Sequence, residues 1–211
     1  MGKLKLYGEL GWGSAIVEAQ LAWYGFEYDF EQVGDLFKSA DARRGLESVN
    51  PLAQVPTLVL ADGTVMTESA AITLFLADLA DGDALVPRAK DPLRPTFLRW
   101  LIFLVANVYP TYTYADDPSR FVEAIEAQQR FKDAVDRYAR RLYSLLKDHA
   151  KEPWFLGTRF SALDVYVTVM TRWRPGRAWF AEHAPRLSAI ATKTETHDRL
   201  AAVWCRNFPS G

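Results

Sequence analysis

The stretch Asn50-Pro51-Leu52-Ala53-Gln54-Val55-Pro56-Thr57-Leu58 is the most informative segment of this 211-residue chain. Its two prolines exclude an ordinary central strand, because proline cannot donate a hydrogen bond to a neighbouring strand. Pro56 nevertheless stands immediately before an apolar run of strand character. Two interpretations follow. A trans proline could simply start a strand, or a cis Val55–Pro56 bond could turn the chain sharply and present the backbone of Val55 at a sheet edge.

Short strand-like and helix-like segments alternate on both sides of this stretch. Strand character is found in residues 3–7, 27–33, 57–60 and 64–66, and helix character in residues 14–24, 36–49 and 70–79. Asp62-Gly63 is a favoured two-residue hairpin turn. The resulting βαβαββα order predicts a parallel pair joined by one right-handed crossover, followed by a hairpin that adds antiparallel strands.

The chain changes character after residue 80. Residues 81–95 contain one glycine and three prolines and form the best linker candidate. Beyond them almost everything has helical periodicity, with a long helix expected to open at Pro118-Ser119. Ser161 and Asp164 have the spacing of a helix capping box. The expected organisation is therefore a mixed αβ domain over 1–80, a linker over 81–95 and an all-α helical domain over 96–211.

Composition excludes several function classes. The chain has 25 Lys+Arg against 26 Asp+Glu, a formal charge of −1, which argues against a basic nucleic-acid binder. Its one cysteine, Cys205, excludes an internal disulfide and a thiolate metal cage, and the three histidines lack metal-ligand spacing. No apolar run is long enough for a membrane span, and the start MGKLKLYGELG does not read as a signal peptide. We expect a soluble cytoplasmic protein without metal.

Together these features resemble a cytosolic glutathione transferase of bacterial type. The resemblance rests on Asn50-Pro51, on Gln54 to Leu58, on Thr67-Glu68-Ser69-Ala70-Ala71-Ile72, and on the Ser161-x-x-Asp164 box, in that order along the chain. It implies a thioredoxin-like βαβαββα domain followed by an all-α domain, and it favours the cis form of Val55–Pro56. It also implies a homodimer with a role in detoxification. Glutathione would be a co-substrate, and no separate cofactor is expected.

The resemblance assigns the glutathione-binding residues. Val55, before Pro56, would pair through its backbone with the cysteinyl part of glutathione, and Gln54 resembles the position that contacts the glycyl end. Ser69 and nearby amides at a helix N-terminus suit the γ-glutamyl carboxylate, because unpaired N–H groups and the helix dipole favour an anion there. Glu68 suits the ammonium group by its charge.

Thiol activation is less clearly assigned. A free thiol with a pKa near 8.5 is mostly protonated at neutral pH, so a donor at the start of the first helix is needed to stabilise the thiolate. Gly13 stands where bacterial cysteine-type relatives carry a cysteine, and Ser14 follows it. Ser14 is the first candidate and Tyr7 the second. A third possibility is that backbone amides alone hold the thiolate.

The resemblance places the site for a small hydrophobic electrophile between the two halves. The candidate residues are Trp12, Asn107, Tyr109 and Tyr112, because aromatic rings and hydroxyls suit an aromatic electrophile. Trp173, Arg174, Arg177 and Trp179 form another aromatic and basic cluster, for which core packing with solvated or ion-paired arginines is the first interpretation.

The expected function is transfer of an alkyl or aryl group to glutathione. The alternative is a non-catalytic protein of the same fold that binds glutathione or another ligand, or that acts in regulation. A glutaredoxin-like reductase is disfavoured because no cysteine lies in the first domain.

Overall fold

The computed structural model describes residues 2–209, which divide into two compact units. The first unit contains the chain up to Val86 and, in addition, the residues from Lys193 onward; the second runs from Pro87 to Thr192. The boundary at 86/87 falls inside the expected linker. The sequence predicts that the C-terminal residues belong to the helical domain, whereas in the structure they group with the first unit.

The first unit is built on a four-stranded sheet. Its strands are β1 (Leu4–Gly8), β2 (Tyr28–Gln32), β3 (Thr57–Val59) and β4 (Val65–Met66), in the order β2-β1-β3-β4. β1 and β2 are parallel, and β3 is antiparallel to both β1 and β4. This confirms the topology expected from the sequence.

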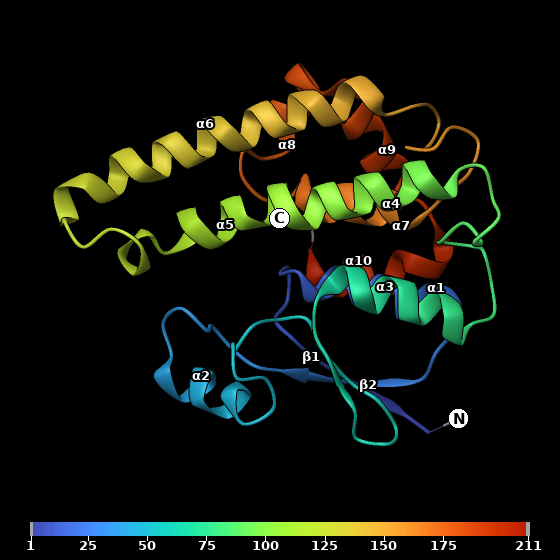
Figure 1. The fold of residues 1–211 in the computed structure, drawn as a ribbon, viewed down its shortest axis with the longest axis horizontal. Helices are drawn as coiled ribbons and strands as arrows, with labels where there is room; N and C mark the ends of the chain where they lie inside the picture. The colour runs from blue at the N-terminus through green and yellow to red at the C-terminus, as the bar shows by residue number, and fades with distance from the viewer. Residues whose placement is uncertain (1, 210–211) are drawn as a thin grey trace. The chain divides into compact units, whose positions relative to one another are not determined.

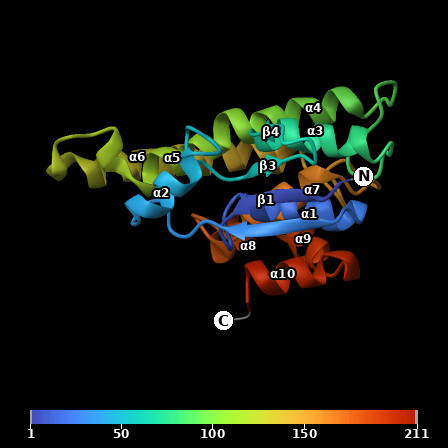
Figure 2. The same cartoon turned by 90° about the horizontal axis from the view of Figure 1, so that it is seen from below.

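Helices α1 (Ser14–Tyr24) and α3 (Ser69–Leu79) pack against each other and share an apolar core with the strands. That core is made of Leu4, Leu6, Val17, Leu21, Leu58, Ile72 and Leu76. Helix α10 (Ala201–Asn207) and the single turn Asp198–Leu200 before it contact α1. In Figure 1, α1, α3 and α10 lie on one side of the strands, whereas α2 (Ala40–Glu47) lies apart from them. Figure 2 shows β1 with α1 beside it.

The second unit is helical. Its helices are α4 (Arg94–Phe103), α5 (Tyr109–Asp116), α6 (Ile125–His149), α7 (Ala162–Met170), α8 (Arg177–His183) and most of α9 (Pro185–Glu195). The π-helical segment Leu104–Val108 joins α4 to α5, and the Tyr109 amide donates to the carbonyl of Leu104. Pro110 accounts for this segment, because its ring has no N–H and clashes with the carbonyl four residues earlier, so the α-helical ladder cannot continue.

One helix boundary differs from the expectation. Pro118–Arg120 forms only a 3-10 turn, and the long helix α6 begins at Ile125. The amide of Phe121 closes that turn on the Pro118 carbonyl, with φ −125° and ψ −21° at Phe121, which is outside the helical region. The ring of Phe121 packs edge-to-face on Tyr114, with centroids 5.0 Å apart. The prediction that Pro118-Ser119 opens this helix was therefore wrong.

The capping box at the start of α7 is confirmed. Asp164 Oδ2 accepts from the Ser161 amide at 2.7 Å and from the Ser161 hydroxyl at 3.0 Å, and its Oδ1 accepts from the Phe155 amide at 2.7 Å. The carboxyl is fully buried, and burial raises its pKa to about 7. Asp164 therefore ties the loop before α7 to the first turn of the helix.

Candidate functional site

Three chain segments converge at one end of the sheet in the first unit. Tyr7 in β1 is opposite Thr57 in β3, and Leu58 is opposite Met66 in β4. Continuing these registers sets Pro56 beside both Gly8 and Glu68. The end of β1, the start of β3 and the end of β4 thus meet. Clefts at the carboxyl ends of strands are frequent ligand sites in α/β sheets.

Two helices also begin at this end of the sheet. α1 starts at Ser14, shortly after β1 ends, and α3 starts at Ser69, shortly after β4 ends. Within residues 2–209 no acceptor is found for the amides of Gly13, Ser14, Ser69 or Ala70. Unpaired N–H groups and the helix dipole make each N-terminus favourable for a negative charge. The site therefore offers two separate positions for anionic groups.

The backbone before β3 is held by a buried asparagine. The Val55–Pro56 bond is cis. Asn50, buried at 3% exposure, donates from Nδ2 to the Gln54 carbonyl and to the Thr57 hydroxyl, both at 3.0 Å. The Thr57 hydroxyl in turn donates to the same Gln54 carbonyl at 2.8 Å. The Gln54 side chain is exposed. Asn50 thus fixes the main chain on which Val55 and Pro56 stand.

Glu68 has an unusual backbone conformation. Its φ is 63° and its ψ 100°, in a region that a non-glycine residue enters at a cost of about 1–3 kcal/mol. Its side chain is exposed and forms no cap on α3, whereas Ser69 is buried and its carbonyl accepts from the Thr73 hydroxyl at 2.8 Å. Backbone strain of this kind concentrates at ligand sites.

Ser14 is fully buried, and its hydroxyl faces the backbone of Glu9. The Oγ donates to the Glu9 carbonyl at 2.9 Å and accepts from the Glu9 amide at 3.1 Å. The hydroxyl hydrogen is thus already donated within the loop. A Cβ at Gly8 would come within 2.5 Å of the Ser14 Cβ, so Gly8 leaves the space that Ser14 occupies.

Tyr7 and Trp12 lie in a small apolar cluster on α2 and the loop before β3. Its buried members are Leu36, Leu46 and Ala53, and the half-buried residues packed on it are Tyr7, Trp12, Val33, Ala42 and Val55. Tyr7 alternates along β1 with Leu6, whose side chain lies in the core with α1 and α3, so it points to the opposite face of the sheet. The structure thus brings Tyr7, Trp12 and Val55 together.

The other expected electrophile contacts lie in the second unit. Asn107 is half-buried in the π-helical segment. Tyr109 and Tyr112 both pack edge-to-face on Trp173, with centroid separations of 5.6 Å and 4.9 Å. The Tyr109 hydroxyl is buried with no acceptor among residues 2–209, and burial raises its pKa well above 10.

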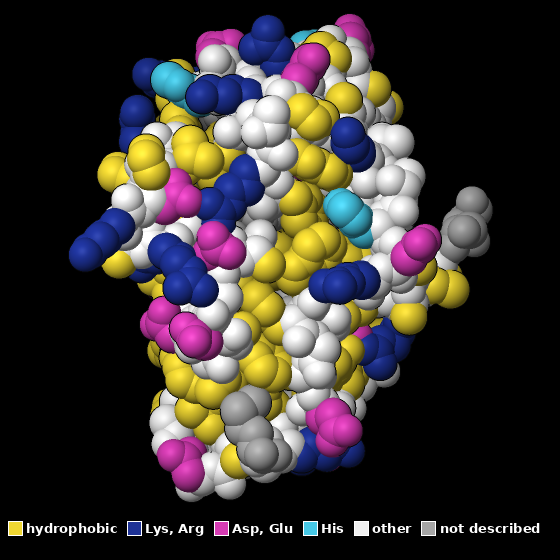
Figure 3. Space-filling view, turned by 90° about the vertical axis from the view of Figure 1, so that its right-hand side faces the viewer, with side chains coloured by type: hydrophobic (Ala, Val, Ile, Leu, Met, Phe, Trp, Pro, Cys, Tyr) yellow, Lys and Arg dark blue, Asp and Glu magenta, His cyan; other side chains and the backbone are white. Residues whose placement is uncertain are grey.

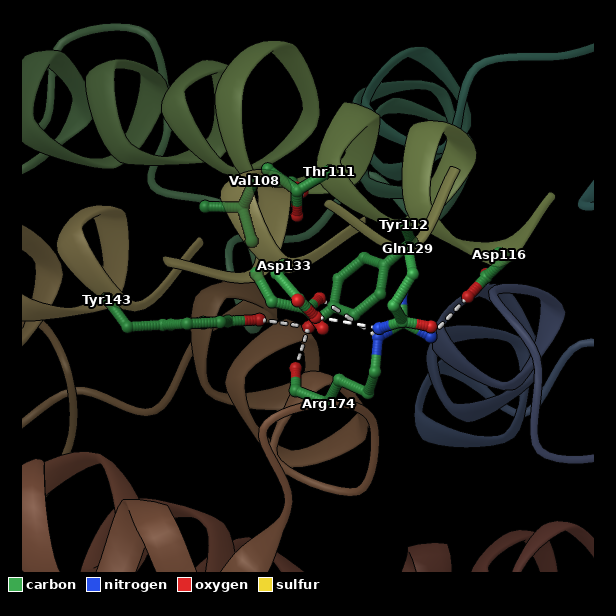
Figure 4. Close-up of polar contacts among 9 residues, drawn as sticks. Val108, Thr111, Tyr112, Asp116, Gln129, Asp133, Tyr143 and Arg174 are labelled. Atoms are coloured by element: carbon green, nitrogen blue, oxygen red, sulfur yellow. Dashed lines mark hydrogen bonds and ion pairs between the residues drawn. The ribbon is translucent and has the colours of Figure 1, made fainter. Parts of the chain in front are cut away.

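Tyr112 belongs to a polar network instead. Its hydroxyl lies 2.6 Å from the Tyr143 hydroxyl and donates to the Arg174 carbonyl at 2.8 Å (Figure 4). Arg174 forms ion pairs with Asp116 at 2.5 Å and Asp136 at 3.1 Å. Burial raises the pKa of Tyr112 above its ordinary value. The network joins α5, α6 and the segment after α7, and it agrees with the interpretation of Arg174 as an ion-paired residue.

The sequence predicts no role for three residues around the site. Glu9 accepts from the Gln32 side chain at 2.8 Å and from the Gly34 amide at 2.7 Å, which ties the loops after β1 and β2 together. Asn50 lies in the stretch 50–58, in which the sequence predicts roles only for Gln54, Val55 and Pro56. Asn207 bonds to Gly11 from the far end of the chain. A contact across that distance has no local signal in the sequence.

Comparison with known proteins identifies the family. The chain is 38% identical over 205 residues to the uncharacterized GST-like protein YncG of Escherichia coli (strain K12), and the match covers 97% of this chain and 98% of the relative. The chain belongs to the glutathione S-transferase superfamily. The family model described as "Glutathione S-transferase, N-terminal domain" matches residues 14–79. The glutathione S-transferase GstA of Escherichia coli O157:H7 is 28% identical over 162 residues, covering 74% of this chain and 76% of GstA.

Solved transferase structures share the fold. A sphingomonad glutathione S-transferase complexed with glutathione is 25% identical and superposes with a TM-score of 0.77, covering 98% of this chain and 100% of that structure. A glutathione transferase homologue from Sulfitobacter with bound glutathione is 23% identical, with a TM-score of 0.86 and coverages of 96% and 97%. Within residues 2–209 no cluster of His, Cys, Asp and Glu is arranged to hold a metal ion, and no helix is long and apolar enough to cross a membrane.

Proposed function

We propose that the protein is a glutathione transferase that binds glutathione at the converging end of the sheet and activates its thiol. The observation that carries the proposal is that two helices with open N-terminal amides begin at the same end of the sheet as the Val55–Pro56 segment. Glutathione has a carboxylate at its γ-glutamyl end and, when activated, a thiolate in its middle. The two helix starts match these two negative charges.

The proposed contacts to glutathione are those that the family resemblance implies, and the open amides at the start of α3 support the first of them. The N-terminus of α3, with Ser69, receives the γ-glutamyl carboxylate, and the exposed carboxylate of Glu68 pairs with the neighbouring ammonium. The backbone of Val55 pairs with the cysteinyl unit, and the exposed Gln54 side chain contacts the glycyl end. Asn50 supports these contacts indirectly because it fixes the Gln54 carbonyl.

The thiolate is held by the amides of Gly13 and Ser14. The Ser14 hydroxyl is engaged with Glu9, and Tyr7 points to the face of the sheet opposite α1, which leaves the open amides at the start of α1 as the best-supported donors. They lower the thiol pKa by stabilising the anion. The thiol proton leaves to solvent, the sulfur attacks the electrophilic carbon, and the leaving group departs with its electron pair.

For the electrophile, Tyr109 is the best-supported polar contact. Its hydroxyl is the buried donor among the expected residues that has no acceptor within residues 2–209. A nitro or carbonyl oxygen on an aromatic electrophile would accept from it. The Tyr112 hydroxyl is already bonded to Arg174 and Tyr143, so it is not the polar contact to the electrophile. The ring of Tyr112 packs on Trp173 and contributes apolar surface.

We also propose a homodimer. Several large apolar side chains are exposed in the isolated chain, among them Leu52, Ile102 and Ile125. Charged side chains of both signs are interspersed with apolar ones on the face in Figure 3. Burial of some exposed apolar groups in a partner subunit would be favourable. Light scattering coupled to size exclusion tests this, and a monomer mass at micromolar concentration would contradict it.

The experiment that tests the function is glutathione binding by calorimetry together with conjugation of glutathione to chlorodinitrobenzene. Binding with turnover is the expected result. The commitment of the Ser14 hydroxyl to Glu9 favours one alternative, a non-catalytic glutathione-binding protein of this fold. Binding without turnover across a panel of aryl halides, epoxides and peroxides would support that alternative. Absence of binding would contradict both.

A further inference from the structure

The last residue of α10 is hydrogen-bonded to the loop between β1 and α1. Asn207 Oδ1 accepts from the Gly11 amide at 3.1 Å, and Nδ2 donates to the Val203 carbonyl at 3.0 Å and to Glu18 Oε2 at 2.8 Å. A carbonyl and a carboxylate only accept hydrogen bonds, so the amide nitrogen must face them and the oxygen must face Gly11. The orientation of the Asn207 side chain is thereby fixed.

Glu18 is the anchor of this arrangement. It is fully buried in α1, and besides Asn207 it accepts from the Tyr28 hydroxyl at 3.1 Å and forms an ion pair with Arg206. A buried carboxylate is tolerated only when it is paired and hydrogen-bonded. Two consecutive side chains of α10 therefore meet one buried group on α1, which holds the C-terminal helix in a defined register.

Gly11 itself packs against the end of α10. Its φ is 75°, in the left-handed region that favours glycine. A Cβ at this position would lie 3.3 Å from the Asn207 carbonyl oxygen and 3.6 Å from the ring of Phe208. The loop thus both donates a hydrogen bond to α10 and packs closely against its end.

We propose that Asn207 is a positioning residue for thiol activation. By holding Gly11, it fixes the loop so that the amides of Gly13 and Ser14, two and three residues further along, point at the glutathione sulfur. This inference rests on the proposed function. It assigns to the C-terminal helix a role in the chemistry of the glutathione site, although Asn207 is not among the proposed contacts to glutathione or to the electrophile.

The test compares Asn207→Leu with Val203→Ala. The first variant removes the bond to Gly11, together with the bonds to Glu18 and to the Val203 carbonyl, with little change in volume. The second weakens the packing of the same helix at a buried residue and leaves the Gly11 bond in place. Two quantities are measured in each: hydrogen exchange of the Gly11 amide without glutathione, and the pKa of the bound thiol from its ultraviolet thiolate absorbance. Steady-state kinetics complete the set.

Asn207→Leu is expected to speed Gly11 exchange, to raise the bound-thiol pKa and to lower kcat/KM by on the order of ten- to a hundredfold, because small displacements of reacting groups are costly. Val203→Ala should lower stability with little change in the thiol pKa. An unchanged thiol pKa in Asn207→Leu, or an equal rise in Val203→Ala, would overturn the proposal. If the wild type fails to bind glutathione, the proposed function falls and this role with it; faster Gly11 exchange in Asn207→Leu would then establish a purely structural clamp.

Discussion

Ser14 and Glu9 close the loop between β1 and α1 through a reciprocal pair of hydrogen bonds, with the Ser14 Oγ donating to the Glu9 carbonyl at 2.9 Å and accepting from the Glu9 amide at 3.1 Å. A hydroxyl has one hydrogen to donate, and here it is donated to the protein itself. Ser14, the first candidate for the thiol donor from the sequence, thus stabilises the loop between β1 and α1. In the proposed function, the open amides of Gly13 and Ser14 therefore hold the thiolate.

Replacing Ser14 with alanine should therefore lower stability more than it disturbs the thiol. Loss of both bonds should reduce the free energy of unfolding by about 1–3 kcal/mol, because the Glu9 groups lose their buried partner. The bound-thiol pKa should rise by no more than it does in Asn207→Leu, which loosens the same loop and keeps the hydroxyl. Urea unfolding and thiolate absorbance measure the two effects.

Tyr7→Phe is the control for this comparison, and it should leave the bound-thiol pKa unchanged because Tyr7 faces away from α1. A much larger pKa rise in Ser14→Ala than in Asn207→Leu would instead make the Ser14 hydroxyl the donor.

The strained backbone of Glu68 predicts opposite effects on stability and on binding. Glu68→Gly should raise the free energy of unfolding by up to about 1 kcal/mol, because glycine adopts a φ of 63° without a clash. It should weaken glutathione binding on the order of tenfold through loss of the charge-assisted contact. Glu68→Gln keeps the strain and removes only the charge, so it should lose affinity without gaining stability. Equal stability of the two variants would refute the strain argument.

The Tyr109 hydroxyl, which has no acceptor within residues 2–209, also predicts opposite effects on stability and on catalysis. Tyr109→Phe should stabilise the protein by about 1–2 kcal/mol, because a buried donor without an acceptor is removed. It should also lower kcat/KM for a nitroaryl electrophile and leave the KM for glutathione unchanged. Tyr112→Phe is the matched control, and it should destabilise because it breaks the bonds to Tyr143 and Arg174. Unchanged kinetics in Tyr109→Phe would remove Tyr109 from the electrophile site.

The buried carboxyl of Asp164 predicts a pH dependence of stability. Its folded pKa is about 7, above the ordinary value of 3.8, so between these values the folded state binds more protons than the unfolded state. Its contribution to stability is therefore fully present below pH 3.8 and is lost as the pH rises through 7. Asp164→Asn should remove this slope, as measured by urea unfolding at several pH values. A wild-type free energy of unfolding that rises relative to that of Asp164→Asn as the pH increases from 3.8 to 7 would contradict the assignment.

Much of the first unit could be predicted because its signals are local. The helix Ser14–Tyr24, stopped by Gly25, and the hairpin around Asp62-Gly63 follow from turn chemistry and hydrophobic periodicity. The capping box at Ser161 and Asp164 is likewise a matter of spacing. Resemblance to a family supplied the rest of the candidate glutathione contacts, since spacing alone did not separate Ser69 from an ordinary helix cap.

What could not be predicted depends on long-range contacts. The sequence around Asn207 has no feature that relates it to Gly11. The C-terminal residues group with the first unit, in which Asn207 bonds to Glu18 and α10 contacts α1. The commitment of the Ser14 hydroxyl to Glu9 also depends on how the loop closes. At Pro118 the sequence predicts the start of α6 too early, because the chain first forms a separate turn before α6 begins.

The central claim is that the first unit binds glutathione and stabilises its thiolate at the start of α1. The most direct measurement is the pKa of the thiol in glutathione bound to the wild-type protein, titrated by ultraviolet thiolate absorbance. The account predicts a pKa at least about one unit below the ordinary thiol value near 8.5. A bound thiol that titrates at its value in free solution would contradict it.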